Sequence, residues 1–280
     1  EPDDFYYVVR RFRDQFIPSV TLSLALEYFN KTFDDLEIVL GQHITIPDVQ
    51  SFDVESGSWE SYYLPVRLPE YDVDGNLVEE GEYRLVEDIV IPINEDGEML
   101  INFMGRRSSA SRDGYQTFPV RSFSAYASRV PGPDPFTWNR PTLALENKIV
   151  MVGAFSAGMA EDEKLTPYGP MYGVEMHTNA LNTIIMDRFL DYAPLWMDFA
   201  ILVVSVLLTA FMAGRFKRVW GGALITVALI IVYFFAVTII FDFQAFILNF
   251  SSPAIAMLVT FVAVVLYRVI TEERKSAYIK

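Results

Sequence analysis

The chain has 280 residues and no cysteine, and its formal net charge is −14. Residues 1–194 hold 15 Lys and Arg against 32 Asp and Glu, whereas residues 195–280 hold 7 against 4. An acidic first part argues against nucleic acid as a partner, because phosphates are bound by Lys and Arg patches. The lack of cysteine excludes a disulfide framework and a thiolate metal site. We therefore expect an acidic domain in water, followed by a part that avoids charge.

The first predicted helix covers Ser19–Asn30. Pro18 and Ser19 form a typical helix start, and Leu22, Leu26 and Phe29 fall on one face at helical spacing.

Residues 48–84 are acidic, aromatic and rich in turn residues, and we interpret them as an insertion that contains a hairpin tipped by Asp74-Gly75. Asp72, Asp74 and Asn76 alternate as calcium ligands can, which makes them weak metal candidates. Tyr83 stands at the twelfth position of that loop, where a calcium site has Glu. A hairpin turn is therefore the favoured interpretation.

A second hairpin is predicted over Glu87–Phe103. Its strands would be Ile89–Ile93 and Met99–Phe103, joined by the polar turn Asn94–Gly97.

A strand, a turn and a helix are predicted over residues 146–190. Lys148–Val152 is a short apolar run typical of a strand buried on both faces. Gly153–Gly158 turns away from it, a loop over Met159–Tyr172 follows, and a helix begins at Gly173-Val174. This order predicts an α/β domain with a mixed, partly parallel sheet over residues 1–193.

Ser156 follows the predicted strand, so we weighed a nucleophile elbow with Asp162 and His177 as partners. Elbows usually have Gly where this chain has Ala154, and the spacing of the three residues is too tight, so a structural turn is favoured over a hydrolase site. The glycines of this turn could instead place N–H groups around an anion. His177 lies on the apolar face of the following helix, where a hydrogen-bonded, half-buried histidine is favoured over a pH-sensitive or ligand-contacting one.

Three apolar runs follow, each long enough to cross about 30 Å of hydrocarbon as a helix. They are Leu195–Gly214, Val219–Phe241 and Phe243–Tyr267, and we place the spans at about 195–214, 219–241 and 246–268 in an all-α bundle over residues 194–270. Asp198 is the single charge within these runs. Pro253 is expected near a helix start or at a kink.

Loop charges predict the orientation in the membrane. The first connection carries Arg215, Lys217 and Arg218, the second carries no cation, and the tail carries Arg274 and Lys275. Positive loops stay on the cytoplasmic side. We therefore expect residues 1–193 outside the cytoplasm and residues 271–280 inside it, with the chain in a bacterial inner membrane or a plasma membrane.

Several stretches together resemble a known family. They are Glu146–Gly153, Thr166–Gly169 and Gly173–His177 with Asn179 and Leu181, supported by Arg10-Arg11, Pro18–Val20 and Ile91–Phe103. This set is similar to the CHASE domain of the second type, a cyclase/histidine-kinase-associated sensory extracellular domain that is followed by about three transmembrane helices. Residues 1–193 would be the C-terminal part of such a domain, without the first strands and N-terminal anchor of the family.

The resemblance implies a signal-transducing receptor, and residues 271–280 resemble the linker that precedes a class III nucleotide cyclase domain. It implies a homodimer that uses ATP or GTP with Mg²⁺ in an output domain beyond Lys280, and no cofactor or catalytic residue in this chain. A histidine-kinase receptor and a non-signalling membrane assembly subunit are the alternatives. The expected partners are membrane lipid and an unknown ligand or extracytoplasmic protein. The candidate ligand-sensing residues are Gly153, Ser156, Thr166, Gly169 and His177.

Overall fold

The computed structural model describes residues 4–13, 15–72, 74, 76–109, 111, 113–123, 145, 148–155, 163–216 and 218–278, without the side chains of Tyr71 and of residues 272–278. The chain divides into two compact units, Glu1–Phe189 and Leu190–Lys280. The elements of the first unit are, in order, β1 (Phe5–Tyr7), β2 (Val9–Phe12), β3 (Gln15–Pro18), α1 (Val20–Tyr28), a 3₁₀ turn (Phe33–Asp35), β4 (Glu37–Val39), β5 (His43–Ile46), β6 (Gln50–Asp53), β7 (Ser58–Arg67), β8 (Glu70–Tyr71), β9 (Leu77–Glu79), β10 (Glu82–Val86), β11 (Ile89–Pro92), β12 (Glu98–Leu100), β13 (Glu163–Thr166), β14 (Gly169–Tyr172) and α4 (Gly173–Ile185).

Helix α1 confirms the first predicted helix. The hydroxyl oxygen of Ser19 accepts the N–H of Leu22 at 3.1 Å, which satisfies one of the donors that every helix start leaves open. Leu22, Leu26 and Phe29 are buried, as their spacing predicts.

The core lies between small antiparallel sheets and the helices α1 and α4. In the sheet β11-β5-β4, Ile89 faces Ile46 and Ile91 faces Ile44 across the strands, and all four side chains are fully buried. Such cross-strand pairs of β-branched residues stabilise a sheet. Among the described residues of this unit, every strand pairing is antiparallel.

The hairpin predicted over Glu87–Phe103 is wrong in its pairing. The turn is present, because the N–H of Asn94 donates to the carbonyl of Glu98 at 2.9 Å. Its two strands then separate: β11 pairs with β5, and β12 pairs with β1. One face of β11, with Ile89 and Ile91, is fully buried, and β5 supplies isoleucines at the matching register.

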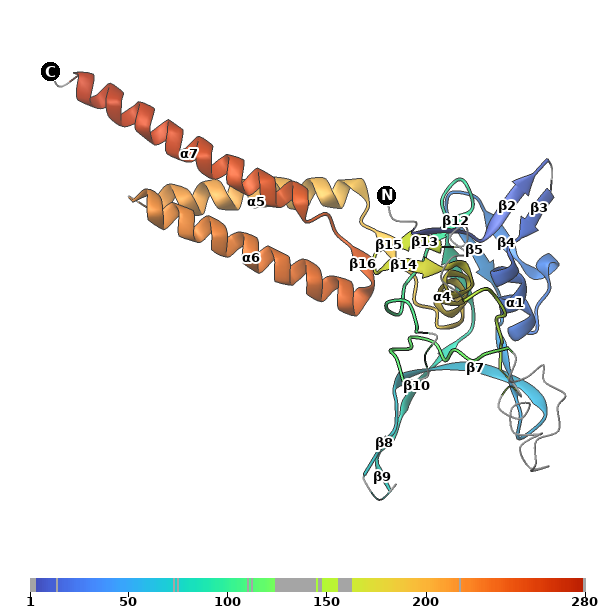
Figure 1. Ribbon diagram of the computed structural model, residues 1–280. Helices are drawn as coiled ribbons and strands as arrows, with labels where there is room; N and C mark the ends of the chain where they lie inside the picture. The colour runs from blue at the N-terminus through green and yellow to red at the C-terminus, as the bar shows by residue number, and fades with distance from the viewer. Residues whose placement is uncertain are drawn as a thin grey trace. The chain divides into compact units, whose positions relative to one another are not determined.

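The segment predicted to be an insertion forms an arm, which we define as residues 48–88. The second half of β7 pairs with β10 and its first half with β6, and the short hairpin of β8 and β9 confirms the turn predicted near Asp74. Figure 1 shows β7 and β10 extending away from α1 and α4, with β8 and β9 at the far end.

The strand predicted over Lys148–Val152 is not present. The segment has no strand pairing, and Val152 is 72% exposed. An extended segment becomes a strand only when a sheet edge accepts its backbone hydrogen bonds, and none of the described strands pairs with this segment. An apolar pattern alone cannot supply that edge.

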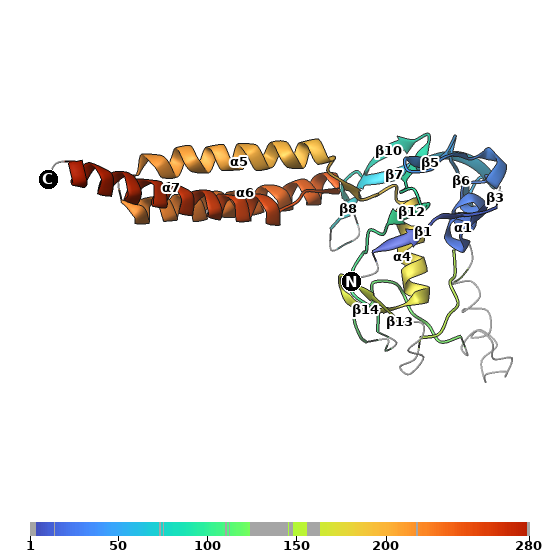
Figure 2. The ribbon, with the colours of Figure 1, turned by 90° about the horizontal axis from the view of Figure 1, so that it is seen from above.

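The second unit contains three helices that are long and apolar enough to cross a membrane, as the sequence predicted. Its elements are β15 (Asp191–Tyr192), α5 (Leu195–Arg215), α6 (Val219–Gln244), β16 (Phe246–Ile247) and α7 (Ser251–Tyr278). The third helix begins at Ser251 and not near residue 246, because residues 246–247 pair as a short strand with residues 191–192. Figures 1 and 2 both show the three helices side by side. Pro253 lies in the first turn of α7, as expected, because a residue there needs no N–H donor.

Two contacts tie this unit together. Strand β15, which precedes α5, pairs in parallel with β16 in the connection between α6 and α7. At the other end of α5, the guanidinium of Arg268 on α7 donates to the carbonyls of Ala213, Gly214 and Phe216, the first at 3.0 Å. Helix α7 is therefore bonded to the C-terminal end of α5.

Candidate functional site

Helix α4 carries a row of buried polar side chains on one face. Glu175, Asn179 and Thr183 follow one another at intervals of four residues, which places them one above the other on a helix. Asn179 Oδ1 accepts the N–H of Met104 at 3.0 Å, and Thr183 Oγ1 accepts the N–H of Asn102 at 3.1 Å. The helix thus holds the extended segment 102–108 by its backbone, as a neighbouring strand would.

Glu175 makes the strongest of these contacts. The residue is 3% exposed, and its carboxylate accepts the N–H of Ser108 at 2.9 Å and the hydroxyl of Ser108 at 2.6 Å. The carboxylate also lies in the first turn of α4, where the helix dipole favours negative charge. A buried carboxylate needs such donors, since its desolvation is costly without them.

Gly153 packs against the start of α4. A Cβ atom at this position would come 2.6 Å from the Cβ of Val174, so only glycine allows the two backbones to approach so closely. Next to it, the ring of Phe155 lies 4.6 Å from the ring of Tyr172. The candidate sensing residue Gly153 therefore positions α4, and Ser156, with its partner candidate Asp162, lies outside the described residues.

Thr166 and Gly169 form the turn between β13 and β14. The hydroxyl of Thr166 donates to the carbonyl of Gly169 at 2.7 Å and accepts the N–H of Tyr168 at 3.2 Å. Gly169 has a φ of +94°, a backbone conformation that favours glycine. The two predicted residues contact each other, and this contact shapes the hairpin that leads into α4.

His177 joins α4 to the N-terminal strand and to α1. Its Nδ1 lies 2.6 Å from the hydroxyl of Tyr6, which also lies 2.6 Å from the hydroxyl of Thr21. The half-buried, hydrogen-bonded histidine favoured from the sequence is confirmed. Burial raises the pKa of Tyr6, so its phenol stays protonated and can donate to one of these partners.

The C-terminal end of α4 is bonded to the arm. The hydroxyl of Tyr62 on β7 donates to the carbonyl of Ile185, the last residue of α4, at 2.8 Å. Arg84 on β10 forms an ion pair of 2.8 Å with Asp187, two residues further on. Tyr62 is buried against the rings of Tyr28 and Phe29, and this burial raises the pKa of its phenol.

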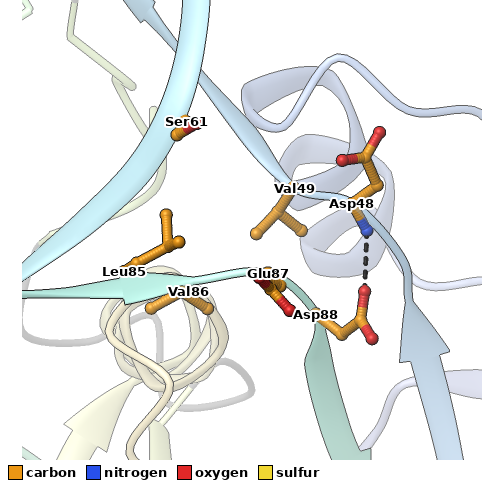
Figure 3. A pocket seen from close by; sticks show the side chains of 7 residues that line it. All are labelled: Asp48, Val49, Ser61, Leu85, Val86, Glu87 and Asp88. Carbon is orange, nitrogen blue, oxygen red and sulfur yellow. Dashed lines mark hydrogen bonds between the residues drawn. The ribbon is translucent and has the colours of Figure 1, made fainter.

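A pocket of about 300 Å³ opens at the base of the arm, between the start of β6 and the strands β7 and β10. Figure 3 shows the side chains that surround it. They are Asp48, Val49, Ser61, Leu85, Val86, Glu87 and Asp88. The N–H of Asp48 donates to the carboxylate of Asp88 at 2.8 Å, so two of the acidic residues hold the rim together.

The weak metal candidates form a turn. One carboxylate oxygen of Asp72 accepts the N–H groups of Asp74 and Asn76, and the other accepts the side-chain amide of Asn76. These bonds shape the tip between β8 and β9. In the part of the chain that the structure describes, no group of three metal-binding side chains gathers.

The topology residues lie at helix ends. Arg215 is the last residue of α5, with its guanidinium over the ring of Phe211, and Arg218 immediately precedes α6. Arg274 and Lys275 lie on the helical extension of α7, which continues seven residues past the apolar span that ends at Thr271. Lys217 lies outside the described residues.

These features define a class of protein. A sheet-rich domain is built around a helix that is bonded at its start, middle and end, and three helices long and apolar enough to cross a membrane follow in the chain. The model of the CHASE2 domain matches residues 2–212, three quarters of the chain, and the protein belongs to the CHASE2 family. A CHASE2 sensor domain followed by such helices is a membrane sensor for signal transduction. Neither a search of curated proteins nor a search of solved structures found a match.

The sequence pointed to part of this site. His177, Asn179 and Gly153 stood in the motif that resembled the family, and all three belong to α4 or contact it. Glu175 stood in that motif too, but its partner Ser108 could not be identified. The bonds of Tyr62, Arg84 and Arg268 were also missed, because each joins residues more than 50 positions apart.

Proposed function

We propose that this chain is the input and transmembrane part of a receptor, with residues 1–193 outside the cytoplasm and the tail after α7 inside it. Helix α7 supports this most directly, because one unbroken helix of 28 residues runs from Ser251 to Tyr278 and carries the apolar span into a charged extension. A helix transmits rotation or displacement along its axis, whereas a flexible linker would absorb it.

The proposed input element is α4. It contacts the N-terminal strand through Tyr6, segment 102–108 through its polar row, and the arm through Tyr62 and Arg84. Nine residues then separate Ile185 from the start of α5. A stimulus that favours one arrangement of these contacts shifts the population of the receptor toward that arrangement. Gly153, Ser156, Thr166, Gly169 and His177 stay candidate ligand-sensing residues in this proposal.

The orientation can be tested by labelling, because the chain has no cysteine to give background. We expect a membrane-impermeant maleimide to label an Asp74→Cys variant on intact cells and to label a Lys217→Cys variant only after permeabilisation. Asp74 is an exposed residue of the arm, and position 217 lies in the cationic loop. The opposite pattern, with position 217 labelled from outside, would reverse the orientation.

The proposed output is a nucleotide cyclase that follows Lys280. We propose that the receptor acts as a homodimer and that membrane lipid surrounds its three apolar helices. We expect the full-length protein in lipid bilayers to convert ATP or GTP to a cyclic nucleotide in the presence of Mg²⁺. The output domain alone should lose the response to the stimulus. Autophosphorylation on histidine would support the histidine-kinase alternative, and an assembly subunit would show neither activity.

A further inference from the structure

The outer face of the arm carries apolar side chains that stay exposed among the residues that the structure describes. Tyr63 pairs with Leu85 and Pro65 with Tyr83 across β7 and β10, and residues at this spacing lie on the same face of a ribbon. Tyr63 and Tyr83 are each 54% exposed, and Leu85 is 47% exposed. We call these four residues the arm patch.

More exposed apolar side chains follow along the arm. They are Phe52, Val54, Trp59, Val66, Leu68, Leu77 and Val78. A two-stranded ribbon cannot bury both of its faces, and the surface of a soluble protein seldom exposes so many large apolar side chains on one short element without a partner. The arm is therefore built for contact with another molecule.

The charge around the patch restricts what that molecule is. Residues 48–88 hold twelve Asp and Glu and two Arg, a net charge of −10. Both arginines are already engaged, Arg67 with Glu79 and Arg84 with Asp187. The carboxylates of Glu80 and Glu82, next to Tyr83, are exposed. The surface that a partner meets is thus apolar in the centre and strongly negative at the rim.

This charge disfavours two possible occupants. Two arms placed face to face would bring a net charge of −10 against another of −10, and like charges across an interface are unfavourable. An anionic lipid surface is repelled for the same reason. The arm is best matched by a partner protein with apolar side chains at the centre of its contact surface and cationic side chains around them. Its charge complements the acidic rim, and its apolar centre can pack on the arm patch.

We infer that the arm is the docking surface for a separate protein with a cationic, apolar-centred contact face. The inference rests on the proposed receptor function, because the docked protein would be the stimulus of that receptor or a part of the stimulus. The bonds of Tyr62 to Ile185 and of Arg84 to Asp187 connect the arm to the end of α4, so docking at the arm reaches the helix that precedes the membrane.

The experiment places a photo-crosslinking phenylalanine analogue at Tyr63 or Tyr83 of the full-length protein in its own cells. Tyr168, which is 56% exposed in the turn between β13 and β14, is the matched control position. A crosslinked protein is identified by mass spectrometry, purified, and measured for binding to the full-length protein over a series of salt concentrations. The combined variant Asp74→Lys, Glu80→Lys, Glu82→Lys is compared with Asp34→Lys, Glu37→Lys, Asp113→Lys, which changes the net charge equally outside the arm.

We expect crosslinks from positions 63 and 83 to one cationic protein, with little from position 168. Its affinity should fall with salt and fall about tenfold or more in the arm variant, and much less in the control variant, since local charge governs complementarity. Crosslinks to a second copy of the chain, to lipid alone or to nothing above the control would overturn the inference, as would equal affinity in the two variants. Crosslinking and binding are read without the output, so loss of the proposed cyclase activity leaves this result intact.

Discussion

Glu175→Ala is expected to lower the free energy of unfolding of the sensor domain by about 3–5 kcal/mol. The variant leaves the buried N–H and hydroxyl of Ser108 without their acceptor, and each buried unsatisfied group costs about 1–3 kcal/mol. Such a loss is a large fraction of the total stability of a domain, about 5–15 kcal/mol. Denaturant titration gives the global effect, and hydrogen exchange at residues 104–109 shows whether segment 102–108 is released first.

Two controls separate the lost contact from the lost charge. Glu175→Gln keeps an acceptor oxygen for Ser108 and should cost about 1–2 kcal/mol, and this variant stays informative if Glu175→Ala does not fold. Glu163→Ala removes a surface ion pair with Arg107 and should cost less than about 1 kcal/mol. An unfolding midpoint of Glu175→Ala equal to that of Glu163→Ala would contradict the role given to the buried carboxylate.

Arg268→Ala is expected to uncouple α7 from α5 and to change the ratio of stimulated to basal output about fivefold or more, the lower end of typical allosteric coupling. The guanidinium holds three carbonyls at the end of α5 that have no partner within their own helix. Without it, the distance distribution between spin labels at positions 215 and 267 should broaden. The lack of native cysteine makes both labels specific.

Arg268→Lys should be intermediate, because an ammonium group cannot reach three carbonyls with the planar fork of a guanidinium. The matched control is Arg215→Ala, which removes a cation at the same end of α5. For this comparison with Arg268→Ala the spin labels are placed at positions 212 and 267. Arg215 contacts Phe211 of its own helix and no residue of α7 among its described contacts. If both substitutions changed the output equally, the net charge at this end, and not the bond between the helices, would be responsible.

The acidic arm shows which features can be predicted from composition and which cannot. The hairpin turn near Asp74 could be predicted, because turn residues act locally. The anchoring of the arm could not, since Tyr62 meets the carbonyl of Ile185 across 123 positions of sequence. No local propensity determines which carbonyl a tyrosine reaches.

The apolar runs near residues 89–103 and 148–152 show the same limit. Their composition correctly indicated extended backbone at β11 and β12, but the partner of each strand depends on which edge offers the matching register. At Lys148–Val152 no described strand pairs with the segment, and the predicted strand did not form. Strand propensity depends on context for this reason, because the measured preference is largely a preference for neighbours.

The sequence by itself determined that this protein has an acidic domain followed by three helices that can cross a membrane. Length and hydrophobicity decide that outcome, because a span must satisfy its own backbone and bury no charge. The first helix, the turn at Asn94–Gly97 and the family motif around α4 also follow from short stretches. Only the tertiary structure decided that Glu175, Tyr62 and Arg268 are the residues that connect the parts, because each acts through a partner brought close by folding.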